Sequence, residues 1–311
     1  MHASRRPLVS VCIPTHDDSG VVADALRSAL RQAYSPLEIL VVDNDSSDGT
    51  WEIVNALAAG DRRVRTLRNA ENIGMARNFN ACISKARGDF VLLLCADDAL
   101  EEGCVELLAS ALMDHPRAVL SACGRILADP TLNQIGIANA RKRNEEVDST
   151  RLRGECFAKG NQIGEPSSVM FRRNAASRGF NPDYSQAIDL EMWFHLLESG
   201  TAILLPDLKS RIRIHGAQTT QGNIRSGRIV RDKQLLFRQY ARRLEANLTF
   251  LEKLEWDTRL ASSVARTRSA GGQVDVENID ELFFKRVFQW LLCPIAILVW
   301  RLHSGHSSQR L

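Results

Sequence analysis

The chain has 311 residues, 44% hydrophobic and 25% charged, which is ordinary for a globular protein with one large domain or two smaller ones. Its net charge is only +3, which argues against a nucleic-acid-binding protein that depends on strong positive charge. The seven Cys form no CxxC pair and several lie in apolar runs, which is typical of reduced cysteines in a cytoplasmic protein.

The first half of the chain alternates apolar runs with amphipathic segments. The apolar run nearest the start is too short for a signal peptide, and we expect it to be a strand. Strands are predicted at residues 8–13, 37–42, 64–67 and 90–94, and helices at 22–30, 51–57, 74–86 and 105–113. Short connections between them predict an α/β fold with a mainly parallel central sheet flanked by helices.

Acidic residues follow the ends of these strands. The fourth strand leads directly into Asp97 and Asp98. In an open α/β sheet, ligands bind outside the carboxyl ends of the strands, and adjacent carboxylates there repel each other unless a cation offsets their charge. Oxygen ligands suit Mg²⁺ or Mn²⁺. The alternative is a solvated turn in which Asp98 caps a helix that begins near Glu101.

The second half is less regular. Strands are predicted at residues 117–127, 169–172, 202–205 and 211–214, and a helix at 188–198. This helix has Asp189 and Glu191 in its first turn, where the helix dipole also favours acidic residues. Residues 129–161 are polar and poorly periodic, and we expect an insertion or lid.

The last part of the chain predicts a helical region at 228–265 and a linker at 267–272. Residues 283–301 then form an apolar run with aromatic residues at both ends. Its fully apolar part is shorter than the ~20 residues that a membrane-spanning helix needs, and Pro294 interrupts it. An interfacial membrane anchor and a helix packed on the protein or on a partner both fit this run.

Six motifs, in this order, resemble those of the family 2 glycosyltransferases of the GT-A fold. They are VSVCIPTHD at 9–17, ILVVDNDSSDGT at 39–50, NIGMARNFN at 72–80, LLLCADDAL at 92–100, GEPSSVMFRR at 164–173 and AIDLEMWFHLL at 187–197. The resemblance implies a Rossmann-like GT-A domain at 1–220, with a nucleotide-binding half at 1–116 and an acceptor half at 117–220. A helical extension at 221–270 and an apolar, membrane-associated segment at 271–311 would follow.

The resemblance also implies the site residues. Asp43 would accept a hydrogen bond from the nucleobase, and Gly74 would allow a close approach of the backbone to the donor. The residues expected to bind the nucleotide sugar are Pro14, Thr15, Asp17, Asp43, Asp45, Asn72, Gly74, Arg77, Ala96 and Asp97.

A divalent metal, Mg²⁺ or Mn²⁺, would be held by Asp97, Asp98 and His215, although a lone His is by default a core or surface residue. The catalytic base would be Asp189, with Glu191 as the alternative base or as a support for the helix. Cys95 stands where the first Asp of the usual Asp-x-Asp motif is found. Since soft sulfur is a poor ligand for a hard cation, we expect Cys95 to be a core residue and leave the strictness of the metal dependence open.

The resemblance implies an inverting enzyme that moves a sugar from a nucleoside diphosphate sugar to a hydroxyl acceptor. The basic second half and the apolar run favour a lipid-linked or surface-polysaccharide acceptor, used by a cytoplasmic protein that is peripheral on the inner membrane. Two rivals stay open, a catalytically weak sugar-nucleotide-binding protein and a sugar-1-phosphate nucleotidyltransferase. The sequence lacks GxGxxG and GxxxxGK, which disfavours a dinucleotide dehydrogenase.

Overall fold

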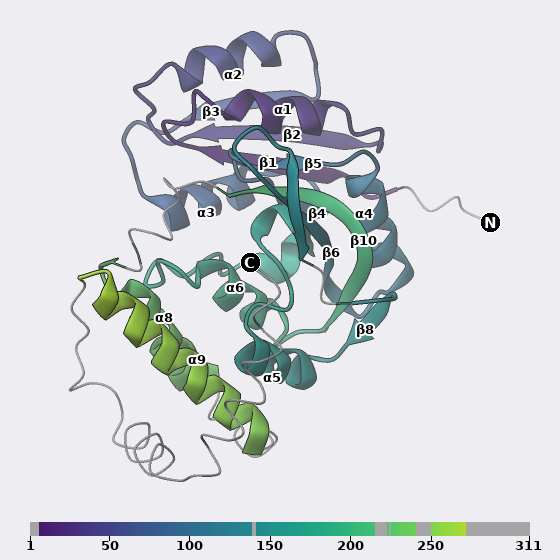
Figure 1. The fold of residues 1–311 in the computed structure, drawn as a ribbon. Helices are drawn as coiled ribbons and strands as arrows, with labels where there is room; N and C mark the ends of the chain where they lie inside the picture. Colours follow the sequence, from purple (N-terminus) through teal and green to yellow (C-terminus); the bar gives the residue numbers. More distant parts are fainter. Residues whose placement is uncertain (1–5, 139–140, 215–222, 224, 241–249, 272–311) are drawn as a thin grey trace.

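The computed structural model describes residues 6–138, 141–214, 223, 225–240 and 250–271 (Figure 1). Within these residues ten strands form one sheet, in which the order of the main path is β3-β2-β1-β4-β9-β6-β10-β5. The α/β fold with helices on both faces of a sheet is confirmed, and His215 and residues 272–311 lie outside the described part.

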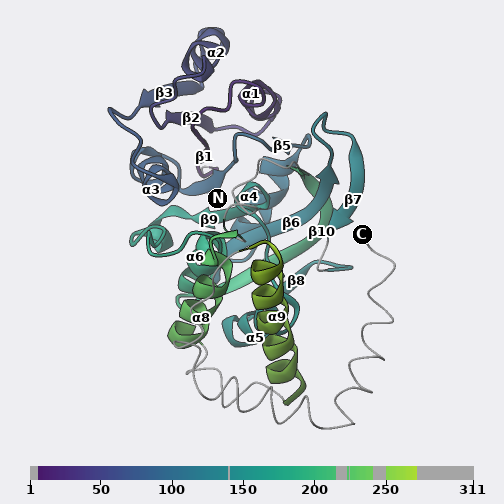
Figure 2. The ribbon, with the colours of Figure 1, turned by 60° about the vertical axis from the view of Figure 1, so that its left-hand side comes forward.

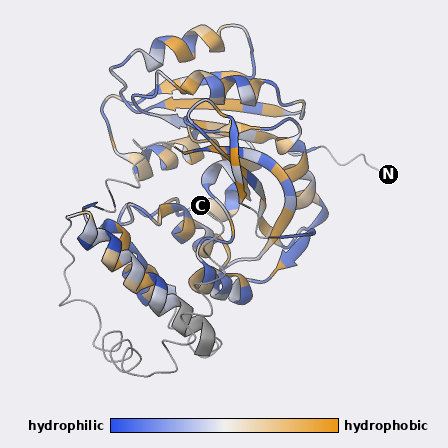
Figure 3. Ribbon diagram, viewed as in Figure 1, coloured by the Kyte–Doolittle hydropathy of each residue, from blue (hydrophilic) through white to orange (hydrophobic). Residues whose placement is uncertain are grey.

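The first half of the sheet is parallel. The strands are β1 (Val9–Thr15), β2 (Leu37–Asp43), β3 (Val64–Arg68) and β4 (Phe90–Leu93), and β1 lies between β2 and β4 in parallel register. The helices are α1 (Val22–Leu30), α2 (Thr50–Ala58), α3 (Met75–Lys85) and α4 (Cys104–Asp114). All eight predicted elements of this half are present. Every residue of β1, β2 and β4 is buried, and these strands are largely hydrophobic (Figure 3), because helices cover both faces.

The second half is mixed. β9 (Val169–Arg172) is antiparallel to β4 on one side and to β6 (Ala118–Ala128) on the other, while β6 is parallel to β10 (Thr201–Arg213). The short strands β5 (Ala99–Leu100), β7 (Gln134–Ala138) and β8 (Glu145–Val147) pair antiparallel with β10, β6 and β10. The 3₁₀ turns η1 (Pro166–Ser168) and η2 (Arg173–Ala176) flank β9. Because β9 lies between β4 and β6, it joins the two halves of the sheet.

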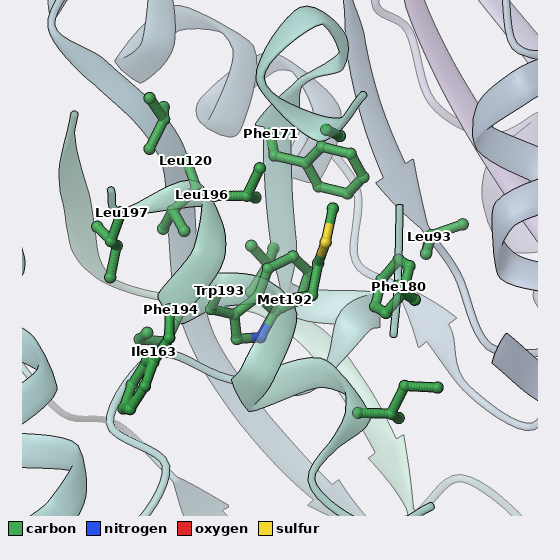
Figure 4. Close-up of a cluster of buried hydrophobic side chains, with 14 of the residues drawn as sticks. Leu93, Leu120, Ile163, Phe171, Phe180, Met192, Trp193, Phe194, Leu196 and Leu197 are labelled. Atoms are coloured by element: carbon green, nitrogen blue, oxygen red, sulfur yellow. The ribbon is translucent and has the colours of Figure 1, made fainter. Parts of the chain in front are cut away.

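Two apolar clusters fill the space between the sheet and the helices. One contains α1 and α4 side chains, and the other contains side chains of α3, α5 (Ser149–Lys159) and α6 (Ile188–Leu196). Trp193 of α6 is fully buried in the second cluster (Figure 4) and donates its indole N–H to the carbonyl of Gly164 at 2.9 Å. α6 is therefore fixed against the segment that leads into β9.

Three expectations for the second half are wrong. Residues 129–161 are not an irregular lid, because they contain β7, β8 and α5, and α5 buries Leu152, Cys156 and Phe157. Their polarity misled because β7 is a largely exposed strand and because α5 also buries Arg153, which donates to the carbonyl of Phe194 at 2.6 Å.

The strands predicted at 202–205 and 211–214 are one strand, β10, whose pairing with β6 shifts register between Leu204 and Leu208. The polar residues that interrupt the apolar pattern of the sequence lie at this irregularity of the strand, so the strand continues through them. The linker predicted at 267–272 is helix as far as Ser269, with Thr267 fully buried.

The helical region is divided into α8 (Arg228–Tyr240) and α9 (Phe250–Ser269), which lie side by side (Figures 1 and 2). Trp256 of α9 packs on Phe157 of α5, with 4.9 Å between the ring centroids, and Tyr240 of α8 packs on Phe194 of α6, with 5.4 Å between the ring centroids. These aromatic contacts attach both helices to the second apolar cluster. Among the described residues, no helix is both long and apolar enough to cross a membrane.

Candidate active site

The turns that follow β1, β2 and β4 meet at the carboxyl edge of the parallel strands. Asp17 and Asp45 have left-handed backbones, with φ of 53° and 63°. The N–H of Asp17 donates to Ser46 Oγ at 2.9 Å, and the N–H of Ser47 donates to Asp17 Oδ1 at 2.7 Å. The turns after β1 and β2 are thereby joined directly.

Asp43 ends β2 and is fully buried. Its carboxylate accepts the N–H of Ser46 at 3.1 Å and pairs with Arg68 Nε at 3.2 Å. Asp45 is more exposed and lies 3.5 Å from the same guanidinium. A nucleobase that donates to Asp43 would therefore share this carboxylate with partners that already shape the turn.

Pro14 and Thr15 are buried at the end of β1. Thr15 Oγ1 donates to Asp18 Oδ2 at 2.8 Å. Burial raises the pKa of Asp18, and the negative charge of Asp97 contributes to the rise. The turn after β1 and the acidic turn after β4 are therefore close enough to interact electrostatically.

Asn72 and Gly74 lie just before α3. Asn72 Oδ1 accepts the N–H of Gly74 at 2.9 Å and the amide of Asn44 at 2.7 Å, which ties this loop to the end of β2. Gly74 has a φ of 82°, a backbone conformation that residues with a side chain rarely adopt, and a Cβ at this position would meet no atom within 4 Å. Arg77 is exposed on the first turn of α3. This loop thus leaves open space beside the turns of β1 and β2.

Asp98 is held from two sides. It accepts a hydrogen bond from Ser167 Oγ at 2.6 Å and one from the backbone N–H of Arg213 at 3.0 Å, and it is only 4% exposed. Burial, followed by the charge of Asp97, raises its pKa well above the ordinary value. The alternative in which Asp98 caps a helix is wrong, because α4 begins at Cys104 with Gly103 at its N-cap.

Cys95 and Ala96 lead into this turn. Ala96 is buried, but Cys95 is only half-buried, so the expectation that Cys95 belongs to the core is wrong. The reason is that β4 ends at Leu93, two residues earlier. The Cys95 N–H donates to Ser167 Oγ at 2.9 Å, and burial raises the pKa of its thiol, which keeps it neutral. A neutral thiol is a still poorer ligand for a hard cation.

The acidic turn offers a partial set of ligands for a metal. One atom each from Cys95, Asp97 and Asp98 lies within 4.8 Å of the other two. Asp98 is engaged by Ser167 and Arg213, whereas Asp97 is half-buried and its backbone carbonyl accepts Arg213 Nε at 2.7 Å. Carboxylate oxygens of this turn, completed by water and by substrate oxygens, fit the usual ligation of Mg²⁺ and Mn²⁺.

Asp189 lies in the first turn of α6 and is half-buried. Its carboxylate accepts the amide of Asn161 at 3.3 Å and the N–H of Leu190 at 2.8 Å. Burial, followed by the charge of Glu165, raises its pKa to about 7, while Arg125 opposes the rise. The charges of Asp97 and Asp189 both raise the pKa of the Cys95 thiol. Asp189 and the acidic turn that contains Cys95 and Asp97 are therefore close enough to interact electrostatically.

Glu191 occupies a different environment on the same helix. It is fully buried, and its two oxygens each accept a guanidinium nitrogen of Arg178 at 2.7 Å. Tyr240 also donates its hydroxyl to Glu191 at 2.8 Å. Because these partners enclose the carboxylate, Glu191 is unsuitable as the alternative base and instead supports the helix.

Sequence reasoning missed several residues of this region. Ser167 and Glu165 lie in the GEPSSVMFRR motif, but the resemblance assigned no role to either residue. Arg213 joins the acidic turn to the end of β10 through contacts with residues 115 and 116 positions away, and no local pattern indicates such a role. His215 lies two residues beyond it, outside the described part.

Comparison with known proteins gives concordant matches. A family model described as Glycosyl transferase family 2 matches residues 10–180. An uncharacterized protein of Mycobacterium tuberculosis is 33% identical over 240 residues, which span 74% of each chain. The chondroitin synthase of Pasteurella multocida is 30% identical over 72% of this chain, but the match spans only 22% of that larger protein.

Two solved structures share the fold. Residues 1–349 of TarS from Staphylococcus aureus, in complex with UDP-GlcNAc, align with a TM-score of 0.62 and 18% identity over 84% of this chain and 72% of that one. The mannosyltransferase PcManGT from Pyrobaculum calidifontis, in complex with GDP-Man and Mn²⁺, aligns with a TM-score of 0.57 and 20% identity over 94% of this chain and 82% of that one.

The raised pKa of Asp189 predicts a pH-dependent cost to stability. Between pH 4 and about 7 the folded chain retains a proton on Asp189 that the unfolded chain has lost, so the free energy of unfolding falls as the pH rises through this range. We expect Asp189→Asn to raise the Tm at pH 8 by roughly 2–4 °C or more, and the gain to shrink as the pH falls toward 4.

Asp61 provides a control of opposite sign, because its hydrogen-bonded pair with Arg63 lowers its pKa. Asp61→Asn should lower the Tm at pH 8. Thermal denaturation at several pH values measures both effects, and a Tm gain for Asp189→Asn that is the same at pH 4 and pH 8 would contradict the raised pKa.

Proposed function

The chain belongs to glycosyltransferase family 2 and is a glycosyltransferase, and from this premise we propose that it transfers a sugar, with inversion, from a nucleoside diphosphate sugar to a hydroxyl acceptor. The observation that carries the proposal is the position of Asp189. A carboxyl with a pKa of about 7 lies close enough to Cys95, in the acidic turn with Asp97, for its charge to raise the pKa of that thiol.

The donor binds over the turns that follow β1, β2 and β4. Thr15, Asp17 and Asp43 line the nucleotide, and the loop of Asn72 and Gly74 borders the sugar diphosphate. The bonds that join these turns support this assignment, since they hold the loops in place before a ligand arrives. TarS and PcManGT, which share the fold, were solved with UDP-GlcNAc and GDP-Man.

Asp97 holds the divalent cation, and Asp98 fixes the turn from behind through Ser167 and Arg213. When bound, the cation supplies positive charge that offsets the charge gained by the leaving diphosphate. The Mn²⁺ in the PcManGT complex is consistent with such a cation. His215, which lies outside the described part of the chain, is the proposed further ligand.

Asp189 acts as the general base. It accepts the proton of the acceptor hydroxyl as that oxygen attacks the anomeric carbon on the face opposite the leaving diphosphate, which inverts the configuration. A base with a pKa near 7 is about half deprotonated at neutral pH and is strong enough to accept the proton. The charge of Glu165 raises the pKa of this base, and the amide of Asn161 donates to its carboxylate.

The acceptor is proposed to be lipid-linked and presented at the cytoplasmic face of a membrane. This proposal depends on the apolar run at 283–301, with its aromatic ends and basic flanks, which lies outside the described residues. It further divides the protein into the GT-A domain at 1–220, a helical extension at 221–270 and the membrane-associated segment at 271–311.

Asp189→Asn should lower kcat by about 10²–10⁴-fold while the Kd for the donor changes less than about twofold, because the variant loses the base but keeps the donor contacts. The kcat of the unmodified enzyme should fall below pH 7, as Asp189 becomes protonated. Transfer assays over pH 5–9 measure both effects. Asp183→Asn, an exposed change nearby, is the control, and equal loss in both variants would contradict the assignment.

The Tm is measured with UDP, GDP, UDP-GlcNAc and GDP-Man, each with and without Mn²⁺. We expect the ligands that carry one of the two nucleobases to raise the Tm, and to raise it more when Mn²⁺ is present. A ligand at 100 times its Kd stabilises the folded state by about 2.7 kcal/mol. Asp97→Asn should remove the metal-dependent part of this rise. If no nucleotide raises the Tm, the donor assignment fails; if binding occurs without turnover, the protein is the catalytically weak binder.

Vesicles that contain anionic phospholipid should co-float with the full chain, and a variant that lacks residues 283–311 should remain in the soluble fraction. The reason is that only the full chain has the apolar run that would be inserted among the lipid headgroups. Neutral vesicles serve as the control for the basic flanks. Equal flotation of both proteins would favour a helix packed on the protein or on a partner.

A further inference from the structure

The first turn of α6 holds Asp189, yet α6 has no N-terminal cap of its own. Its N-cap residue is Ala187, and no side chain from that position bonds to the helix. The first N–H groups of a helix need partners, and a helix without them frays. Something else must therefore keep this turn in place.

Asp232 of α8 accepts hydrogen bonds from the three residues that lead into α6, and so holds the entry to the helix rather than its first N–H groups. Asp232 Oδ2 accepts the backbone N–H groups of Ser185 at 2.7 Å, Gln186 at 2.5 Å and Ala187 at 3.1 Å. Asp232 is fully buried, and all three N–H groups donate to the same carboxylate oxygen. The carboxylate lies at the chain segment that enters α6, two residues before Asp189.

Other contacts from the same part of the chain reinforce this arrangement. Asn223 donates its amide to the carbonyl of Ser185 at 3.2 Å and to Gln186 Oε1 at 2.9 Å. At the other end of α8, Tyr240 donates its hydroxyl to Glu191, which lies one helical turn after the 185–187 segment that Asp232 contacts. α8 therefore holds α6 on both sides of Asp189.

We propose that Asp232 is a positioning residue for catalysis, which fixes the first turn of α6 and so keeps Asp189 at the place where the acceptor hydroxyl is deprotonated. The inference rests on the proposed role of Asp189 as the base. It extends the catalytic machinery to a helix that lies beyond residues 10–180, where the family model matches.

Asp232 acts through the backbone. The groups whose charge shifts the pKa of Asp189 are Glu165, at the start of η1, and Arg125, on β6, while Cys95 and Cys156 are thiols that respond to the charge of Asp189. Burial is the largest cause of the raised pKa, and burial depends on the position of the α6 turn. If that turn loosens, Asp189 gains water and its pKa falls toward the ordinary value of a carboxyl.

Three variants of the full chain test this inference. Asp232→Leu has the same branched outline but no acceptor, so it leaves three N–H groups unpaired. Asp232→Asn keeps one acceptor oxygen and loses the charge. Val230→Ala is the structural control, because Val230 packs against Leu260 and Val264 of α9 and has no role at the 185–187 segment.

For Asp232→Leu we expect kcat to fall about 10–100-fold, since a misplacement of about 1 Å costs on that order. The KM for the donor should stay within about twofold, and the pH at which kcat falls should move below that of the unmodified enzyme. Asp232→Asn should show a smaller fall in kcat in the same direction. Amide hydrogen exchange at residues 185–190 should be faster in both variants. Val230→Ala should lower the Tm without changing the pH profile or this exchange.

The proposal is overturned if Asp232→Leu, corrected for its folded fraction, keeps the kcat and the pH profile of the unmodified enzyme. If that variant does not fold, Asp232→Asn decides, and unchanged kcat and unchanged exchange at 185–190 then overturn it. A loss of kcat no larger than that of Val230→Ala at equal Tm also overturns it.

Failure of the proposed function has a different signature. Asp189→Asn would then retain transfer, while faster exchange at 185–190 in the Asp232 variants would still show that Asp232 holds the α6 turn.

Discussion

A carboxylate taken out of water costs several kcal/mol unless cations or hydrogen-bond donors replace its hydration, and this constraint governs the candidate site. Asp43 is matched by Arg68 and Ser46, and Asp98 by Ser167 and the N–H of Arg213. Each matched carboxylate holds together chain segments that are distant in the sequence. The buried acids therefore form the frame of the site.

The partners do not fully offset burial at Asp98, whose pKa stays well above its ordinary value, and the same is true of Asp189. The pKa of Asp189 rises to about 7, since burial and the charge of Glu165 outweigh Arg125 and the hydrogen bonds that it accepts. Glu191, two residues later on the same helix, has a full set of partners in Arg178 and Tyr240. An acidic residue thus has a structural role at Glu191 and is suited to proton transfer at Asp189. The difference lies in the partners of the two carboxyl groups alone.

The topology explains how the two sides of the site come together. β9 is inserted between β4 and β6, so the 3₁₀ turn that precedes it brings Ser167 against the acidic turn after β4. Trp193 then ties α6 to Gly164, at the beginning of the same segment. α8 completes the arrangement by supplying Asp232 to the start of α6. The helical extension therefore contacts the candidate site through α8 and is part of its structural support.

The sequence by itself determined the alternation of strands and helices in the first half, the acidic turns after the strands and the family, because these depend on local apolar periodicity and on motifs of a few residues. Only the tertiary structure decided that Asp98 is hydrogen-bonded to Arg213, that Cys95 lies beside Asp97 and Asp98, and that Glu191 is enclosed. It also turned the polar segment 129–161 into two edge strands and a helix packed in the core. These features depend on partners that are as many as 115 residues apart in the chain, and the charge state of a buried carboxyl follows from such partners rather than from its neighbours in sequence.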